Sequence, residues 1–98
     1  MHQFTINAGI QLVPISSQKH PYEWVDMVID IIKESGLSYE VGAFNTSIEG
    51  SYEQVRLLVD RINDFLVQEQ CPEWLLNVQY QLRGDRSMSM GEKTEKFR

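Results

Sequence analysis

Apolar residues recur every second position in some segments of the chain and every three or four positions in others. The order of these strand-like and helix-like segments constrains the fold most. From Phe4 to Pro14 the even positions are apolar and the odd positions are small or polar, which is typical of a half-buried strand. From Pro21 to Gly36 apolar residues recur every three or four positions, which predicts a helix opened by a proline and closed by a glycine.

The middle of the chain returns to strand-like alternation. Residues 37–43 and 46–49 alternate in polarity, so they predict two strands joined by a turn near Phe44 and Asn45. A capping-box pattern follows at Ser51 and Gln54, which predicts the start of a second helix.

The second helix is expected to run until Cys71-Pro72 stops it, because proline cannot continue a helix. Residues 76–82 then alternate as a fourth strand, and residues 84–98 form a polar tail. That tail is expected to form either an extra strand or an arm that reaches a neighbouring subunit, with Met88 and Met90 as its apolar contacts.

The predicted order is therefore βαββαβ. Right-handed crossovers place both helices on one side of a four-stranded antiparallel sheet, which is the α+β ferredoxin-like plait. With 98 residues, 42% of them hydrophobic, we expect residues 1–98 to form one domain.

The other face of this sheet is expected to be uncovered and rich in amides. Strand parity assigns this set to it: Thr5, Asn7, Gly9, Gln11, Glu40, Gly42, Ser47, Glu49, Asn77, Gln79 and Gln81. Amide side chains both donate and accept hydrogen bonds, so the face suits either a heteroaromatic ligand or a polar subunit interface. A small domain buries little surface alone, which favours a homo-oligomer.

Charge and targeting signals limit the partners. The formal net charge of −5 disfavours nucleic acid and anionic membranes as partners. The N-terminal residues lack a secretory signal, and no apolar run approaches the roughly 18 residues of a membrane span, so we expect a cytoplasmic protein.

Catalytic and metal-binding patterns are weak. His2 and His20 have no second ligand at metal spacing, and Cys71 has no partner cysteine. Residues 14–19 lack the glycine-rich phosphate loop of acylphosphatases, which share this strand and helix order, and the predicted open face lacks the aromatics of RNA-recognition motifs. We therefore predict a binding module with no catalytic residue, no metal and no cofactor.

The stretch SGLSYEVGAFNTSIEGSYEQV, residues 35–55, resembles the core motif of the thiamine-binding protein family, single-domain (YkoF-like) relatives of the hydroxymethylpyrimidine/thiamine-binding proteins. The similarity extends to IQLVP at residues 10–14 and to SMSMGEKTEKFR at residues 87–98. The resemblance implies a ferredoxin-like fold, a homodimer or homotetramer joined through the sheets, and binding of thiamine or its hydroxymethylpyrimidine precursor without catalysis.

The resemblance also implies a site in the central motif. Asn45 and Thr46 are expected to hydrogen-bond an aminopyrimidine, Glu49 to face the thiazolium ring or accept from the exocyclic amine, and Phe44 to offer a stacking surface. Strand parity adds Asn7 and Gln11 to the predicted ligand-binding set.

Each of these roles has a structural alternative. Asn45 can serve only as a left-handed turn residue, Thr46 can fill strand space, Glu49 can lead into the capped helix, and Phe44 can plug a subunit interface. The competing function is a ligand-free or amino-acid-sensing interaction module in which the amides join two sheets.

Overall fold

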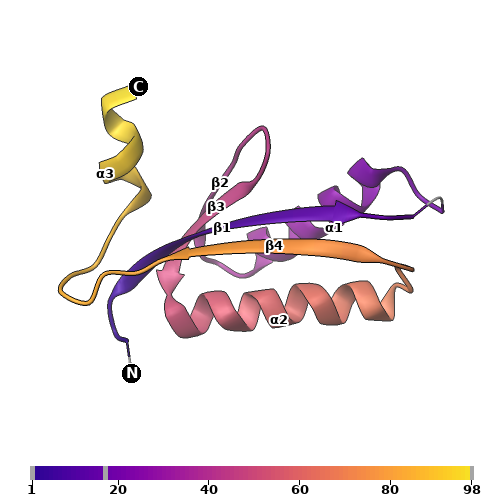
Figure 1. Ribbon diagram of the computed structural model, residues 1–98, viewed down its shortest axis with the longest axis horizontal. Coiled ribbons are helices and arrows are strands. Elements are labelled where there is room, and N and C mark those ends of the chain that lie inside the picture. The colour runs from indigo at the N-terminus through magenta and orange to yellow at the C-terminus, as the bar shows by residue number, and fades with distance from the viewer. Residues whose placement is uncertain (1, 17, 98) are drawn as a thin grey trace.

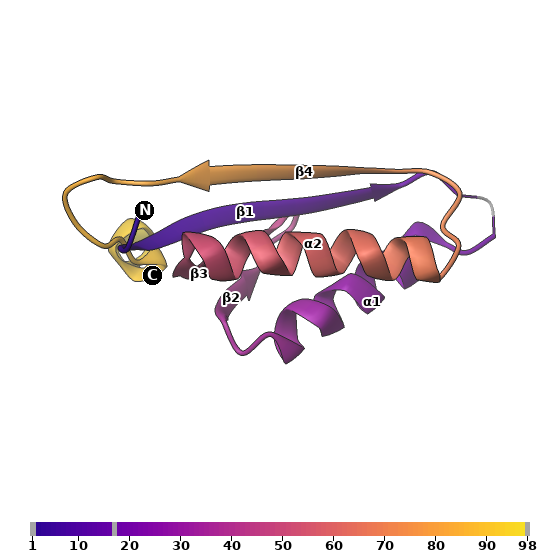
Figure 2. The same cartoon turned by 90° about the horizontal axis from the view of Figure 1, so that it is seen from below.

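The computed structural model describes residues 2–16 and 18–97, and it has the predicted plait. The elements are β1 (Thr5–Pro14), α1 (Pro21–Glu34), β2 (Ser38–Val41), β3 (Thr46–Ser51), α2 (Tyr52–Gln68), β4 (Trp74–Gln81), α3 (Met90–Thr94) and the 3-10 turn η1 (Glu95–Phe97). The strands form one antiparallel sheet in the order β2-β3-β1-β4. Helices α1 and α2 cover the same face of this sheet (Figures 1 and 2).

Strand parity decides which side chains enter the core between sheet and helices. Ile6, Ala8 and Ile10 of β1 and Ile48 of β3 are buried there, as the alternation predicts. The helices bury their apolar stripes against them, and this set comprises Trp24, Val28, Ile31, Ile32, Val55, Leu58, Ile62 and Leu66. The odd positions of β1 consequently face the opposite side of the sheet.

Most of the predicted helix boundaries are confirmed. Pro21 opens α1, and Gly36 follows its end with a φ of 78°, a left-handed conformation that glycine adopts without strain. The predicted capping box of α2 is present, because Ser51 Oγ accepts from Gln54 N–H and Gln54 Oε1 accepts from Ser51 N–H.

The end of α2 differs from the prediction. The helix ends at Gln68, before Cys71-Pro72, and Gln70 takes a left-handed φ of 59°. Cys71 N–H then donates to Leu66 C=O at 3.0 Å, and Gln70 N–H donates to Val67 C=O at 3.1 Å. This pattern is a Schellman motif, which the sequence conceals because glutamine replaces the usual glycine.

The C-terminal segment, residues 86–97, does not form the extra strand that was one of its two predicted forms. It folds onto its own chain, at the end of the molecule where β1 begins (Figure 2). Met88 N–H donates to Thr5 C=O at 3.0 Å, Thr5 N–H donates to Ser87 Oγ at 2.9 Å, and the Met88 side chain is buried. This segment therefore covers part of the face that was expected to be open.

Candidate functional site

Cross-strand rows organise the face of the sheet away from α1 and α2, which we call the amide face. One row places Asn7 of β1 between Glu49 of β3 and Gln81 of β4. The next places Gly9 between Ser47 and Gln79. Residues at these register positions point to the same side of the sheet, so the predicted grouping of polar side chains is confirmed.

Asn7 is the unusual member of this face. The residue is only 7% exposed, although its side chain faces away from the helices. Neither its amide oxygen nor its amide nitrogen has a hydrogen-bond partner within residues 2–16 and 18–97. Buried polar groups are nearly always paired, so an amide unsatisfied at both ends is a functional candidate.

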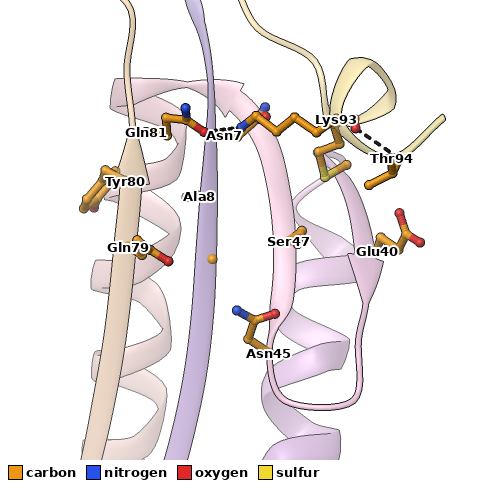
Figure 3. Close-up of a pocket in the computed structure, with 12 residues that line it drawn as sticks. Asn7, Ala8, Glu40, Asn45, Ser47, Gln79, Tyr80, Gln81, Lys93 and Thr94 are labelled. Carbon is orange, nitrogen blue, oxygen red and sulfur yellow. Dashed lines mark hydrogen bonds between the residues drawn. The ribbon is translucent and has the colours of Figure 1, made fainter. Parts of the chain in front are cut away.

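A cavity of about 490 Å³ lies directly over Asn7 (Figure 3). The floor comes from β1 and β4, one wall from the β2–β3 hairpin, and the other wall from α3. The lining residues are Asn7, Ala8, Gly9, Glu40, Asn45, Ser47, Gln79, Tyr80, Gln81, Met90, Lys93 and Thr94. Amide, hydroxyl and charged groups thus converge on one concave space.

Asn45 reaches this cavity because β1 has a glycine at position 9. A Cβ atom on Gly9 would lie 3.1 Å from Asn45 Nδ2, so the amide rests against the bare backbone of β1. The turn that carries Asn45 is closed by Gly42 N–H, which donates to Asn45 C=O at 2.8 Å. Gln70 is the one non-glycine residue with positive φ in the described chain, so Asn45 is not the left-handed turn residue that we considered.

Gln11 lies further along the amide face. Its Oε1 accepts from Asn77 Nδ2 at 3.1 Å, and both residues line a second hollow of about 440 Å³. Gly9, Asn45 and Gln79 line both hollows, which therefore adjoin one another.

The remaining three predicted site residues lie outside the main cavity. Thr46 is buried on the helical side of the sheet, in the same parity as Ile48, and Phe44 is 85% exposed at the tip of the hairpin. Glu49 is on the amide face, where its Oε1 accepts from Met90 N–H at 2.8 Å. The structure thus brings Asn7 and Asn45 together, with Gln11 nearby. Glu49 lies beside Asn7 in its cross-strand row but outside the cavity lining, whereas Phe44 and Thr46 are separated from the cavity.

Sequence reasoning missed the wall formed by α3. Lys93 Nζ donates to Gln81 Oε1, and Thr94 Oγ1 donates to Met90 C=O at 3.1 Å (Figure 3). Lys93 places a cation beside the row that contains Asn7. The N-capping serine at 89, followed by Glu92, was the one local signal for this helix.

Two ionisable groups near β4 have altered pKa values. Burial raises the pKa of Tyr80, which points away from the cavity, and the neighbouring Tyr52 and Asp60 add to this effect. A bidentate hydrogen bond from Arg83, at 2.8 and 2.7 Å, lowers the pKa of Asp85. Asp85 is therefore ionised at neutral pH and pairs with Arg83 in the turn that leads to the C-terminal segment.

The described part of the chain contains neither a metal-ligand cluster nor a membrane-spanning helix. Within residues 2–16 and 18–97, no three His, Cys, Asp or Glu side chains cluster as metal ligands do. None of the helices described is long and apolar enough to cross a membrane.

The sequence of this chain is similar to one protein family and to a bacterial protein. The model of a family described as "Thiamine-binding protein" matches residues 8–98. The UPF0045 protein CPE1503 of Clostridium perfringens is 28% identical over 96 residues, which is 96% of this chain and 98% of that protein.

Two solved structures have the same fold over nearly their whole length. A domain of unknown function, DUF77, from Bacillus cereus has a TM-score of 0.89 and 27% identity, covering 97% of this chain and 91% of that one. A Thermotoga maritima protein named a "putative thiamine biosynthesis/salvage protein" has a TM-score of 0.88 and 26% identity, covering 96% and 99%.

Proposed function

Because this chain belongs to the thiamine-binding protein family, we propose that it binds thiamine or its hydroxymethylpyrimidine precursor, without catalysis, in the cavity on the amide face. The volume of about 490 Å³ lies within the usual range for small-molecule sites, roughly 300 to 1,000 Å³. Family membership and cavity size together favour a small ligand over a macromolecule.

The unpartnered amide of Asn7 is the observation that carries the proposal. An aminopyrimidine presents an exocyclic amine next to a ring nitrogen. One carboxamide can accept from that amine while donating to that nitrogen, just as asparagine pairs with adenine in DNA recognition. Asn7 therefore offers the complementary pair of groups, and because both amide atoms are shielded from solvent, a ligand reaches them only when a covering side chain moves aside.

The surrounding groups fit the rest of such a ligand. Asn45 and Gln79 add hydrogen-bonding amides at the sides of the cavity, and Ser47 adds a hydroxyl. The carboxylate of Glu40 stands on the β2 wall, where a negative charge favours a cationic thiazolium ring. Direct contacts from Phe44, Thr46 and Glu49 stay predictions from the family motif, and Gln11 borders the ligand only if it extends into the second hollow.

Ligand binding is tested by measuring the melting temperature with each candidate compound in a thermal-shift series. At a tenfold excess over its Kd, a ligand that binds only the native state adds about 1.4 kcal/mol to the free energy of unfolding. For a domain of this size the melting temperature should rise by roughly 5 to 10 °C with thiamine or hydroxymethylpyrimidine. The series also includes their phosphates and common amino acids. If no pyrimidine compound raises the melting temperature, the interaction module is favoured instead.

We also propose a cytoplasmic homodimer or homotetramer in which a second copy covers the rest of the amide face. Val13 and Leu75 are paired across β1 and β4 on this face and are both exposed, Leu75 at 54%. Paired apolar side chains beside an amide-rich surface are typical of a buried interface.

The oligomeric state is measured by light scattering after gel filtration at micromolar concentration. We expect a multiple of 11.4 kDa for the wild type and a smaller assembly for Leu75→Glu, because a charge in the interface is costly to bury. A wild-type mass of one chain would contradict the proposed interface.

A further inference from the structure

The two residues that flank Asn7 in its cross-strand row both hold the C-terminal segment. On one side Glu49 Oε1 accepts from Met90 N–H at 2.8 Å, and on the other side Gln81 Oε1 accepts from Lys93 Nζ. The segment is thus fastened on either side of the one amide in the row that has no partner.

The segment depends on these contacts for its position. Helix α3 has five residues, and helices this short are unstable in isolation. Upstream of α3, Met88 is buried with 6% of its surface exposed, and Ser87 and Met88 hydrogen-bond the backbone of Thr5. Downstream of this anchor, the contact from Glu49 fixes where α3 begins.

The docked helix supplies one wall of the cavity. Met90, Lys93 and Thr94 line it at the end next to Glu40 of β2, and they supply the apolar contact, the cation and the hydroxyl there. Without α3 the cavity would lose this wall and lie more open on the sheet surface.

We propose that Glu49 is a positioning residue that holds residues 86–97 over the site, and that docking of this segment and ligand binding strengthen each other. The inference rests on the proposed function for its ligand. In this role Glu49 acts through Met90 N–H, which is the alternative to the direct ligand contact that the family motif predicts for it. Because coupling between two binding events is reciprocal, a ligand that contacts the docked helix also stabilises its docking.

Substitutions at both ends of the hydrogen bond separate this role from direct contact. Glu49→Ala removes the acceptor, whereas Glu49→Gln keeps an acceptor oxygen and removes the charge. Met90→Pro removes the donor at the first position of α3, where proline is well tolerated, and Ser89 before it already has an extended backbone with ψ of 151°. Met90→Leu also loses the methionine side chain but keeps the backbone N–H, so it is the matched control for Met90→Pro.

The first readout is the Kd of thiamine and of hydroxymethylpyrimidine by calorimetry. We expect Glu49→Ala to raise Kd about tenfold, Glu49→Gln less than about threefold, and Met90→Pro about tenfold relative to Met90→Leu. The double variant Glu49→Ala/Met90→Pro should bind about as well as either single variant, because both remove one interaction. Equal losses for Ala and Gln at position 49, or additive losses of about a hundredfold, would overturn the positioning role.

The second readout needs no ligand. Trypsin cleavage after Arg86 and Lys93 should be faster in Glu49→Ala and Met90→Pro than in the wild type and Met90→Leu, because the segment is released. Unchanged cleavage would overturn the positioning role even if affinity falls. A wild type that binds neither compound would remove the proposed function and the coupling, whereas the cleavage rates would still decide whether Glu49 holds the segment.

Discussion

Asn7→Leu is expected to give a protein that melts at a higher temperature than the wild type and no longer binds thiamine or hydroxymethylpyrimidine. A buried amide without partners costs about 1 to 3 kcal/mol, and leucine has a similar shape without polar atoms. The same change removes both hydrogen bonds proposed for the aminopyrimidine, so Kd should rise by about a hundredfold or more, equivalent to about 2.7 kcal/mol. Denaturant unfolding and calorimetry measure the two effects separately.

Asn77→Leu is the matched control for this change. Asn77 lies on the same face, but it is exposed and already hydrogen-bonded to Gln11. We expect its replacement to leave ligand affinity within about threefold, because it removes no group from the proposed pyrimidine site. If Asn7→Leu lowered stability, or kept its affinity within about twofold, the amide would be a structural group and not a ligand group.

Strand parity predicted much of the fold and the amide face, because one buried face fixes the register of every strand. It placed Asn7 and Gln11 on the correct side of β1 from the alternation with Ile6, Ala8 and Ile10. It could not predict that Asn7 is buried. That burial comes with a segment more than 80 residues away, joined to β1 through hydrogen bonds between Thr5, Ser87 and Met88.

The family motif grouped residues by sequence, and the fold separates them. Asn45 and Thr46 are neighbours in the chain, yet Asn45 lies over Gly9 and Thr46 packs beneath the sheet. The alternation already paired Thr46 with Ile48, so parity alone argued against Thr46 on the amide face. Where a family motif and the strand alternation disagree about which face a residue occupies, the alternation is the more direct guide to the direction of the side chain.

Short polar segments carry too little local signal to be placed from sequence. The C-terminal segment is held by one hydrogen bond each with Glu49 and Gln81 and by two with Thr5, and none of these pairings leaves a periodic pattern in the chain. The end of α2 was mispredicted for a related reason, since Gln70 adopts a left-handed conformation that sequence patterns assign to glycine. Both features depend on tertiary contacts that override local preference.

Gly9→Val tests the shape of the cavity and leaves its polar groups in place. A Cβ at this position would come within 3.1 Å of Asn45 Nδ2, and the two methyl groups of valine extend further into the cavity floor. Asn45 is a loop side chain that can swing aside, and valine favours strands whereas glycine weakens them, so the melting temperature should stay equal or rise. Thiamine affinity should nevertheless fall by about thirtyfold or more, since the ligand loses both the Asn45 contact and the space above β1.

Gly84→Val is the control for this last substitution. A Cβ on Gly84 would meet no atom within 4 Å, and Gly84 lies outside the cavity lining, so its affinity should equal that of the wild type. Retained affinity in Gly9→Val would mean that the ligand does not occupy the floor between Asn7 and Asn45, and the second hollow around Gln11 and Asn77 would then be the place to look. A fall in affinity together with a lower melting temperature would instead indicate a disturbed β1–β3 pairing. The two measurements on one variant thus separate a filled cavity from a damaged sheet, because only the filled cavity lowers affinity while stability is kept.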